Sequence, residues 1–143
     1  MEIRIRAWCK KGDILIPENS MYYNVGITPN YVVVDDTGHE DEWNFGEKEN
    51  FELMLWTGLQ DSGKKDIYEG DIIRVWFHDN VYYDHEVYYG IKYDYPAFDL
   101  RPSMCDDCNS LQAIIIDSCN DIERIEVIGN IYENPELSQD ARN

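Results

Sequence analysis

The chain has 143 residues, 43% of them hydrophobic and 13% aromatic, so it can bury one core or two small packed ones. Its 29 acidic and 12 basic residues give a net charge of −17, which argues against direct DNA or RNA binding because that affinity comes largely from Lys and Arg neutralising phosphates. No stretch approaches the ~20 apolar residues of a membrane span, so we expect no membrane contact.

The first predicted element is a strand over residues 2–8, in which apolar residues alternate with Arg4, Arg6 and Trp8. The alternation predicts that one face is buried and the other exposed. It also lacks the uninterrupted apolar core of a signal peptide, so we expect a cytoplasmic protein. Short strands follow at residues 14–16 and 31–34.

Residues 35–52 are the most acidic stretch, and we expect a loop or connection there. Its acids, above all Glu40, Asp41 and Glu42, are candidates for an interaction surface. Carboxylates also bind calcium, but the stretch lacks the ligand spacing of an EF-hand loop. A solvated acidic surface is the plainer interpretation.

The second half of the chain reads as a series of short strands separated by turn signals. The strand at 53–56 should end at Thr57-Gly58, and Asp61-Ser62-Gly63-Lys64 is a turn signal. The run 72–77 is apolar on both faces except at Arg74, which places it centrally in a sheet. The remaining expected elements are a hairpin of 85–93 with 96–100, strands at 111–116 and 125–131, and a helical turn at 134–137.

Three segments resemble the YopX family: residues 3–8, residues 53–73 with Thr57-Gly58-Leu59 and Tyr68-Glu69-Gly70-Asp71, and residues 125–137. The resemblance implies an all-β protein with a small SH3-like β-barrel and an additional small N-terminal β-subdomain. It also implies a phage or prophage gene, hence a protein in the cytoplasm of a bacterial host cell. We expect residues 1–50 to form the subdomain and acidic connection, 51–137 the barrel, and 138–143 a frayed tail.

Cys105-Asp106-Asp107-Cys108 is the sharpest chemical motif, since a CxxC pair supplies two zinc ligands. Cys9 and Cys119 are isolated, however, and flanking aspartates disfavour thiolates, so an ordinary loop is the plainer interpretation. His78 and His85 form a metal pair only if two strands bring them together. No nucleophile elbow, phosphate loop or dinucleotide fingerprint occurs, so we expect no cofactor and no enzyme activity.

The aromatic run 76–98 is the second candidate surface, because aromatic residues on a sheet favour protein recognition. Its candidate residues are Trp76, Tyr82, Tyr83, Tyr88, Tyr89 and Tyr93. The sequence therefore favours an accessory protein that acts by contact with a protein partner or by self-association as a homo-oligomer. Two alternatives stay open: an acidic nucleic-acid mimic that blocks a host DNA-binding protein, and a metal-binding protein that uses Cys105 and Cys108.

Overall fold

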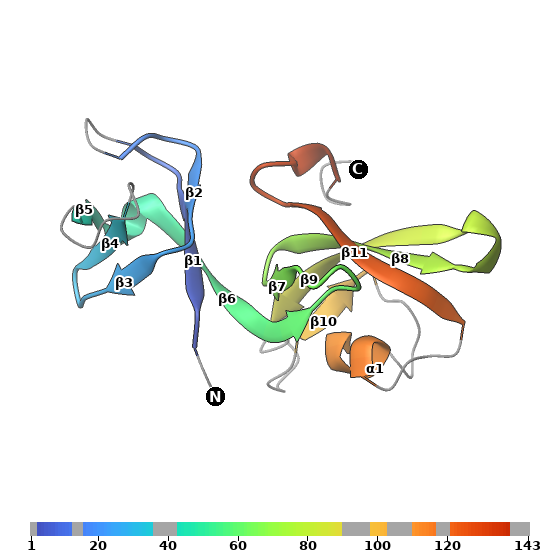
Figure 1. Ribbon diagram of the computed structural model, residues 1–143. Helices are drawn as coiled ribbons and strands as arrows, with labels where there is room; N and C mark the ends of the chain where they lie inside the picture. Colours follow the sequence, from blue (N-terminus) through green and yellow to red (C-terminus); the bar gives the residue numbers. More distant parts are fainter. Residues whose placement is uncertain are drawn as a thin grey trace. The chain divides into compact units, whose positions relative to one another are not determined.

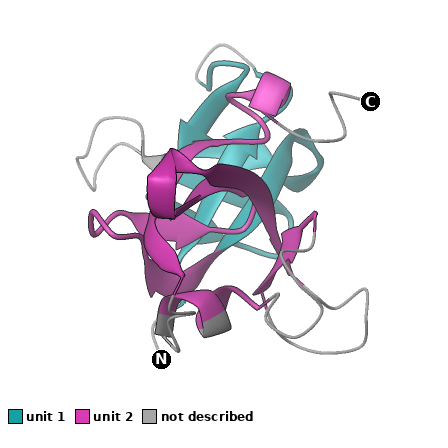
Figure 2. Cartoon of the chain, turned by 90° about the vertical axis from the view of Figure 1, so that its right-hand side faces the viewer, with its two compact units in different colours: residues 1–55 teal, residues 56–143 magenta. Residues whose placement is uncertain are grey.

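The structure is a computed structural model that describes residues 3–12, 16–35, 43–89, 98–102, 110–116 and 121–137. The chain divides into two compact units, Met1–Leu55 and Trp56–Asn143, which Figure 2 shows in different colours. Antiparallel strands build both units, and the one α-helix among the described residues is short. The prediction of an all-β protein is therefore confirmed, with that helix as an addition.

Two small sheets form the first unit (Figure 1). In one, β1 (Ile5–Cys9) pairs on one side with β2 (Ser20–Tyr22) and on the other with the first half of β6 (Phe51–Gln60). In the other, β4 (Tyr31–Asp35) lies between β3 (Val25–Ile27) and β5 (Trp43–Glu47). The 3-10 helix η1 (Lys48–Asn50) joins β5 to β6.

A buried apolar cluster packs inside this unit. Its members are Ala7, Cys9, Ile16, Tyr22, Val32, Val34 and Phe51.

Two predictions for this unit need correction. The first strand is not half-buried: Arg6 and Trp8 on one face are as buried as Ala7 and Cys9 on the other, so both faces of β1 are covered. The stretch 35–52 is not simply a connection either, since it contains β5, η1 and the start of β6. Trp43 and Phe45 supply the β-propensity that the surrounding acids obscured.

The second unit contains a four-stranded antiparallel sheet in the order β10-β9-β8-β11. Its strands are β8 (Asp71–Phe77), β9 (Tyr82–Tyr89), β10 (Phe98–Arg101) and β11 (Ile122–Asn130). The second half of β6 pairs with β7 (Asp66–Tyr68), and the other elements are η2 (His78–Asn80), α1 (Leu111–Ile116) and η4 (Pro135–Leu137). The central position predicted for residues 72–77 is confirmed, because β8 lies between β9 and β11.

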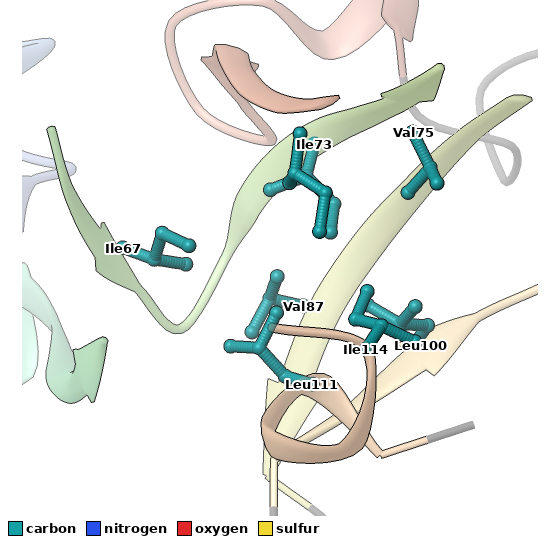
Figure 3. Packing of buried hydrophobic residues seen from close by; sticks show 8 residues of the cluster. Ile67, Ile73, Val75, Val87, Leu100, Leu111 and Ile114 are labelled. Carbon is teal, nitrogen blue, oxygen red and sulfur yellow. The ribbon is translucent and has the colours of Figure 1, made fainter. Parts of the chain in front are cut away.

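One face of this sheet packs on α1 and β7 around a buried cluster that Figure 3 shows. Strand residues Ile73, Val75 and Val87 point into it, as do Leu111 and Ile114 from the helix. Because side chains alternate along a strand, the intervening residues of β8 and β9 must face the other side of the sheet. The core thereby fixes which side chains are presented outward.

Two further predictions are wrong in this unit. Residues 111–116 form a helix, not a strand; a short apolar run fits either element, and periodicity cannot separate them. Thr57-Gly58 does not end its strand either, because β6 continues to Gln60 with an irregularity in its pairing between Trp56 and Gln60. Gly58 lies in this irregular part with a φ of 82°, a conformation that glycine adopts without steric cost. The antiparallel pairing predicted for the hairpin is present between β9 and β10.

Candidate functional site

The turn at Asp61 is held by its own carboxylate. Oδ1 accepts hydrogen bonds from the backbone N–H groups of Gly63 and Lys65, both at 2.9 Å, and Oδ2 accepts one from Val127 of β11 at 2.9 Å. The neighbouring Ser62 hydroxyl accepts from the Ile125 N–H at 2.8 Å. These bonds close the turn and fasten it to β11, so Asp61 has a structural role.

The turn between β7 and β8 follows the same principle. Asp71 Oδ2 accepts the Tyr68 N–H at 2.8 Å, and Gly70 adopts a φ of 89°. The Gly70 N–H donates to the Val87 carbonyl at 2.8 Å, while its carbonyl accepts the Ile131 N–H at 2.9 Å. This turn therefore ties β9 and the end of β11 together.

A third turn follows β11. The Asn130 side-chain oxygen accepts hydrogen bonds from the backbone N–H groups of Tyr132 and Glu133. The backbone N–H of Asn130 donates to Asn134 Oδ1 at 3.2 Å. A Cβ at Gly129 would collide with the Asn134 side chain, so a larger residue there would displace that side chain. Asn134 thus closes this turn, and the predicted helical turn is present as η4. We call these three the motif turns.

The outward side of the sheet carries a different arrangement, in cross-strand rows. In the first row, Arg124 of β11, Trp76 of β8 and Tyr82 of β9 lie directly opposite one another. The Arg124 guanidinium lies over the Trp76 ring at 4.2 Å from its centroid, and the rings of Trp76 and Tyr82 are 4.8 Å apart. Directly opposed residues of antiparallel strands stabilise each other in this way.

The second row consists of Glu126, Arg74 and Asp84. Arg74 donates through two nitrogens to the two Asp84 oxygens at 2.8 and 3.0 Å, and its guanidinium lies 4.0 Å from the Tyr82 ring centroid. That hydrogen-bonded carboxylate raises the pKa of Arg74 above its ordinary value, so the guanidinium stays protonated. The Trp76 indole N–H donates to Glu126 and joins the two rows.

A further pair extends the arrangement toward β10. Arg101 donates to Glu86 at 2.9 Å, and its guanidinium lies 4.3 Å from the centroid of the Tyr88 ring. We define the aromatic–arginine face by the residues of the two rows and this extension. They are Arg74, Trp76, Tyr82, Asp84, Glu86, Tyr88, Arg101, Arg124 and Glu126.

The aromatic–arginine face is close to electrically neutral, although the whole chain carries −17. Its three arginines balance its three carboxylates. The Tyr82 side chain nevertheless remains 45% exposed in this arrangement. The face thus combines exposed ring surface with arginine side chains and carries no net charge.

The predicted interaction residues are divided by the structure. Trp76, Tyr82 and Tyr88 belong to the aromatic–arginine face. Tyr83 and Tyr89 alternate with them on β9; Tyr83 packs edge-on to Phe77 yet is 59% exposed, and Tyr89 packs against Phe98. Outside the described residues lie Tyr93, Glu40, Asp41, Glu42, Cys105 and Cys108.

The sequence interpretation missed the charged members of this face, namely Arg74, Asp84, Glu86, Arg101, Arg124 and Glu126. Alternation along β8 could have placed Arg74 with Trp76, and alternation along β9 could have placed Asp84 with Tyr82. The two members from β11 gave no such signal, because their position depends on a register between segments about 50 residues apart in the chain.

The two histidines near the hairpin have different surroundings. His78 is exposed in η2, whereas His85 is only 4% exposed and points its Nδ1 at the Pro102 carbonyl, 2.7 Å away. Since a carbonyl only accepts, Nδ1 carries a proton, and in the neutral ring Nε2 is then the unprotonated nitrogen. Within the described residues, Nε2 has no hydrogen-bond partner. Burial lowers the pKa of His85, and the backbone bond offsets part of that effect.

Metal ligands do not gather within the part of the chain that the structure describes, where no three His, Cys, Asp or Glu side chains could hold an ion together. Cys9 lies in the core of the first unit, while the CxxC pair falls outside the described ranges. The zinc hypothesis therefore stays a prediction. Within those same ranges, no helix is long and apolar enough to cross a membrane.

Comparisons with known proteins address the fold and the family. A family model described as YopX protein matches residues 4–139. The crystal structure of protein EF1440 from Enterococcus faecalis has a TM-score of 0.61 and 23% sequence identity, covering 96% of this chain and 98% of that chain. At that identity the likeness concerns the fold alone. No curated protein matches.

Proposed function

The chain belongs to the YopX family, and from that premise we propose that it is a non-enzymatic accessory protein of a phage or prophage, acting in the host cytoplasm by protein–protein contact. The contact surface is the aromatic–arginine face. The observation that supports this choice is the stack of Arg124, Trp76, Tyr82 and Arg74 across three strands.

The chemistry of this stack matches that of protein interfaces. Trp, Tyr and Arg supply most of the residues whose truncation costs a protein complex its affinity. Here their side chains are already ordered, because Asp84 fixes Arg74 and Glu126 fixes the Trp76 indole. A partner that binds this face would therefore lose little side-chain entropy on association.

The partner is either a host or phage protein or a second copy of the chain. Self-association is compatible with the acidic composition because the aromatic–arginine face, with three arginines and three carboxylates, carries no net charge that would repel a second copy there. Nucleic-acid mimicry is the weaker alternative, since a mimic needs uninterrupted carboxylates. On this face, Asp84 and Glu86 each pair with an arginine.

The proposal also includes the SH3-like barrel for the second unit. Its support is the meander β8-β9-β10, the return of β11 to β8, and the two register irregularities between β11 and β8. Bulges of this kind bend strands and allow a small sheet to close.

A host-lysate pull-down with mass spectrometry tests the function. Tyr82→Ser removes an exposed ring from the aromatic–arginine face, and Tyr83→Ser removes the adjacent exposed ring from the other side of the same strand. We expect a specific partner, or self-association in sedimentation velocity, that Tyr82→Ser abolishes and Tyr83→Ser preserves. A wild-type protein that is monomeric and captures no specific partner would contradict the proposal.

A further inference from the structure

We propose a second docking surface in the first unit: the outer face of the β3–β4–β5 sheet binds a Lys- or Arg-rich segment of a partner protein that carries an apolar anchor. This surface is separate from the aromatic–arginine face and does not depend on it. It gives the chain two binding surfaces, one in each unit.

The register of this sheet shows which face is outward. Val32 and Val34 of β4 are fully buried, and Gly46 of β5 lies opposite Val32 on the same side. A Cβ at Gly46 would collide with the ring of Phe51, so the backbone and the buried side chains are closely packed on this side of the sheet. The alternating residues of both strands must then face outward.

The outward side is apolar and exposed. Tyr31 is 47% exposed and Phe45 61%, and the two rings meet edge to face with centroids 6.3 Å apart. Val33 lies opposite Phe45, and Gly26 of β3 lies opposite Val33. An added Cβ at Gly26 would meet only Val33, so the glycine leaves a low, open strip beside the aromatic pair.

A rigid turn holds Tyr31 in place. The Thr28 N–H donates to the Tyr31 carbonyl at 2.9 Å, and the Tyr31 N–H donates to the Thr28 hydroxyl oxygen at 3.0 Å. Beside this turn lies a shallow hollow of about 470 Å³. Its lining residues are Pro29, Asn30, Tyr31, Glu47, Lys48 and Glu49. The hollow has room for a side chain of a bound segment, against a ring that is already positioned.

Charge selects the kind of partner. Two exposed carboxylates, Glu47 and Glu49, line the hollow, and Lys48 is the basic residue of the same lining. A basic segment would find carboxylates for its ammonium or guanidinium groups and the faces of Tyr31 and Phe45 for cation–π contact. An acidic segment would be repelled.

Three fluorescein-labelled peptides test the proposal with the full chain: Lys-Lys-Leu-Trp-Lys-Lys, its charge-reversed form with Glu, and a neutral form with Ser. Fluorescence anisotropy gives the affinities, and amide chemical shifts of isotope-labelled protein locate the contact. Phe45→Ser and the charge reversal Glu47→Lys are the test variants. Tyr83→Ser, an exposed aromatic in the other unit, is the matched control.

We expect the lysine peptide alone to bind and to shift amides around Tyr31, Phe45 and Glu47. Phe45→Ser should weaken binding about tenfold, as for an interface anchor, and Tyr83→Ser should leave it unchanged. Added salt should weaken it as well. Equal binding of the three peptides, lysine-peptide shifts elsewhere on the chain, or no binding would overturn the proposal. So would concentration-dependent shifts at this face without peptide, because they would identify the occupant as a second copy.

Discussion

In the motif turns, side-chain oxygens accept backbone N–H groups of their own unit, whereas on the aromatic–arginine face side chains pair with one another and leave ring surface exposed. Asp61 is buried and accepts three backbone hydrogen bonds. Tyr82 is held between Trp76 and Arg74 but stays 45% exposed. The comparison indicates that the motif turns use their side chains to hold the backbone, whereas the aromatic–arginine face keeps exposed ring surface that these internal contacts do not use.

The largest expected effect is on stability, in the first motif turn. Asp61→Ala leaves the N–H groups of Gly63, Lys65 and Val127 without their acceptor and should destabilise the protein by about 3 kcal/mol. Urea unfolding followed by circular dichroism measures the difference. Asp79→Asn, at an exposed left-handed position that Asn tolerates, is the control and should change little. A loss no larger than that of the control would show that the Asp61 bonds do not hold the turn.

The next effect concerns the third motif turn. Gly129→Ala places a Cβ against Asn134 and should cost about 1–3 kcal/mol, because Asn134 must move and its bond to the Asn130 N–H is lost. Gly63→Ala is the matched control, since its Cβ would lie 3.5 Å from the nearest Asp61 oxygen, an ordinary contact. The same urea series compares the two; equal stabilities would rule out the close approach at Gly129.

The next prediction concerns how the free energy of unfolding depends on pH through His85, which lies on the core side of the sheet. The pKa of His85 is lowered by burial, so the unfolded chain binds more protons than the folded chain below the ordinary His pKa of about 6.5. Stability should therefore be complete above that pH and decline as the pH falls toward the folded pKa. His85→Asn, which keeps a donor for the Pro102 carbonyl, should remove this component. Urea titrations across this range measure it, and identical pH profiles for both proteins would contradict the assignment.

The smallest expected effect on stability is on the aromatic–arginine face. Tyr82→Ser and Tyr83→Ser should each change the free energy of unfolding by less than about 1 kcal/mol, because both rings are substantially exposed. Thermal melts check this. A much larger loss for Tyr82→Ser would mean that the stack serves mainly to hold the sheet, and would weaken its interpretation as a binding surface.

Local chemistry made several features predictable. The turn at Asp61 was readable because Asp, Ser and Gly favour turns for known reasons, and the central position of residues 72–77 followed from apolar residues on both faces. Which strands pair with one another could not be predicted from the sequence. β1 pairs with β2 and with β6, partners that its own alternation does not specify, and the mostly apolar run of α1 fits a strand equally well.

The candidate face illustrates the same limit. Trp76 and Tyr82 could be selected from their residue types alone. Their partners Arg124 and Glu126 could not, because the β11–β8 register includes irregularities that shift which residues meet. Side-chain alternation predicts a face within one strand, whereas a binding surface across three strands requires the tertiary structure.

Photo-crosslinking in host cells tests the central claim most directly. A benzoylphenylalanine at position 82 projects from the aromatic–arginine face, and the same group at position 83 projects from the other side of β9 with comparable exposure. We predict a discrete crosslinked product, either a partner or a dimer of the chain, from position 82 and none from position 83. Equal products from both positions, or a product from position 83 alone, would contradict the assignment of binding to this face.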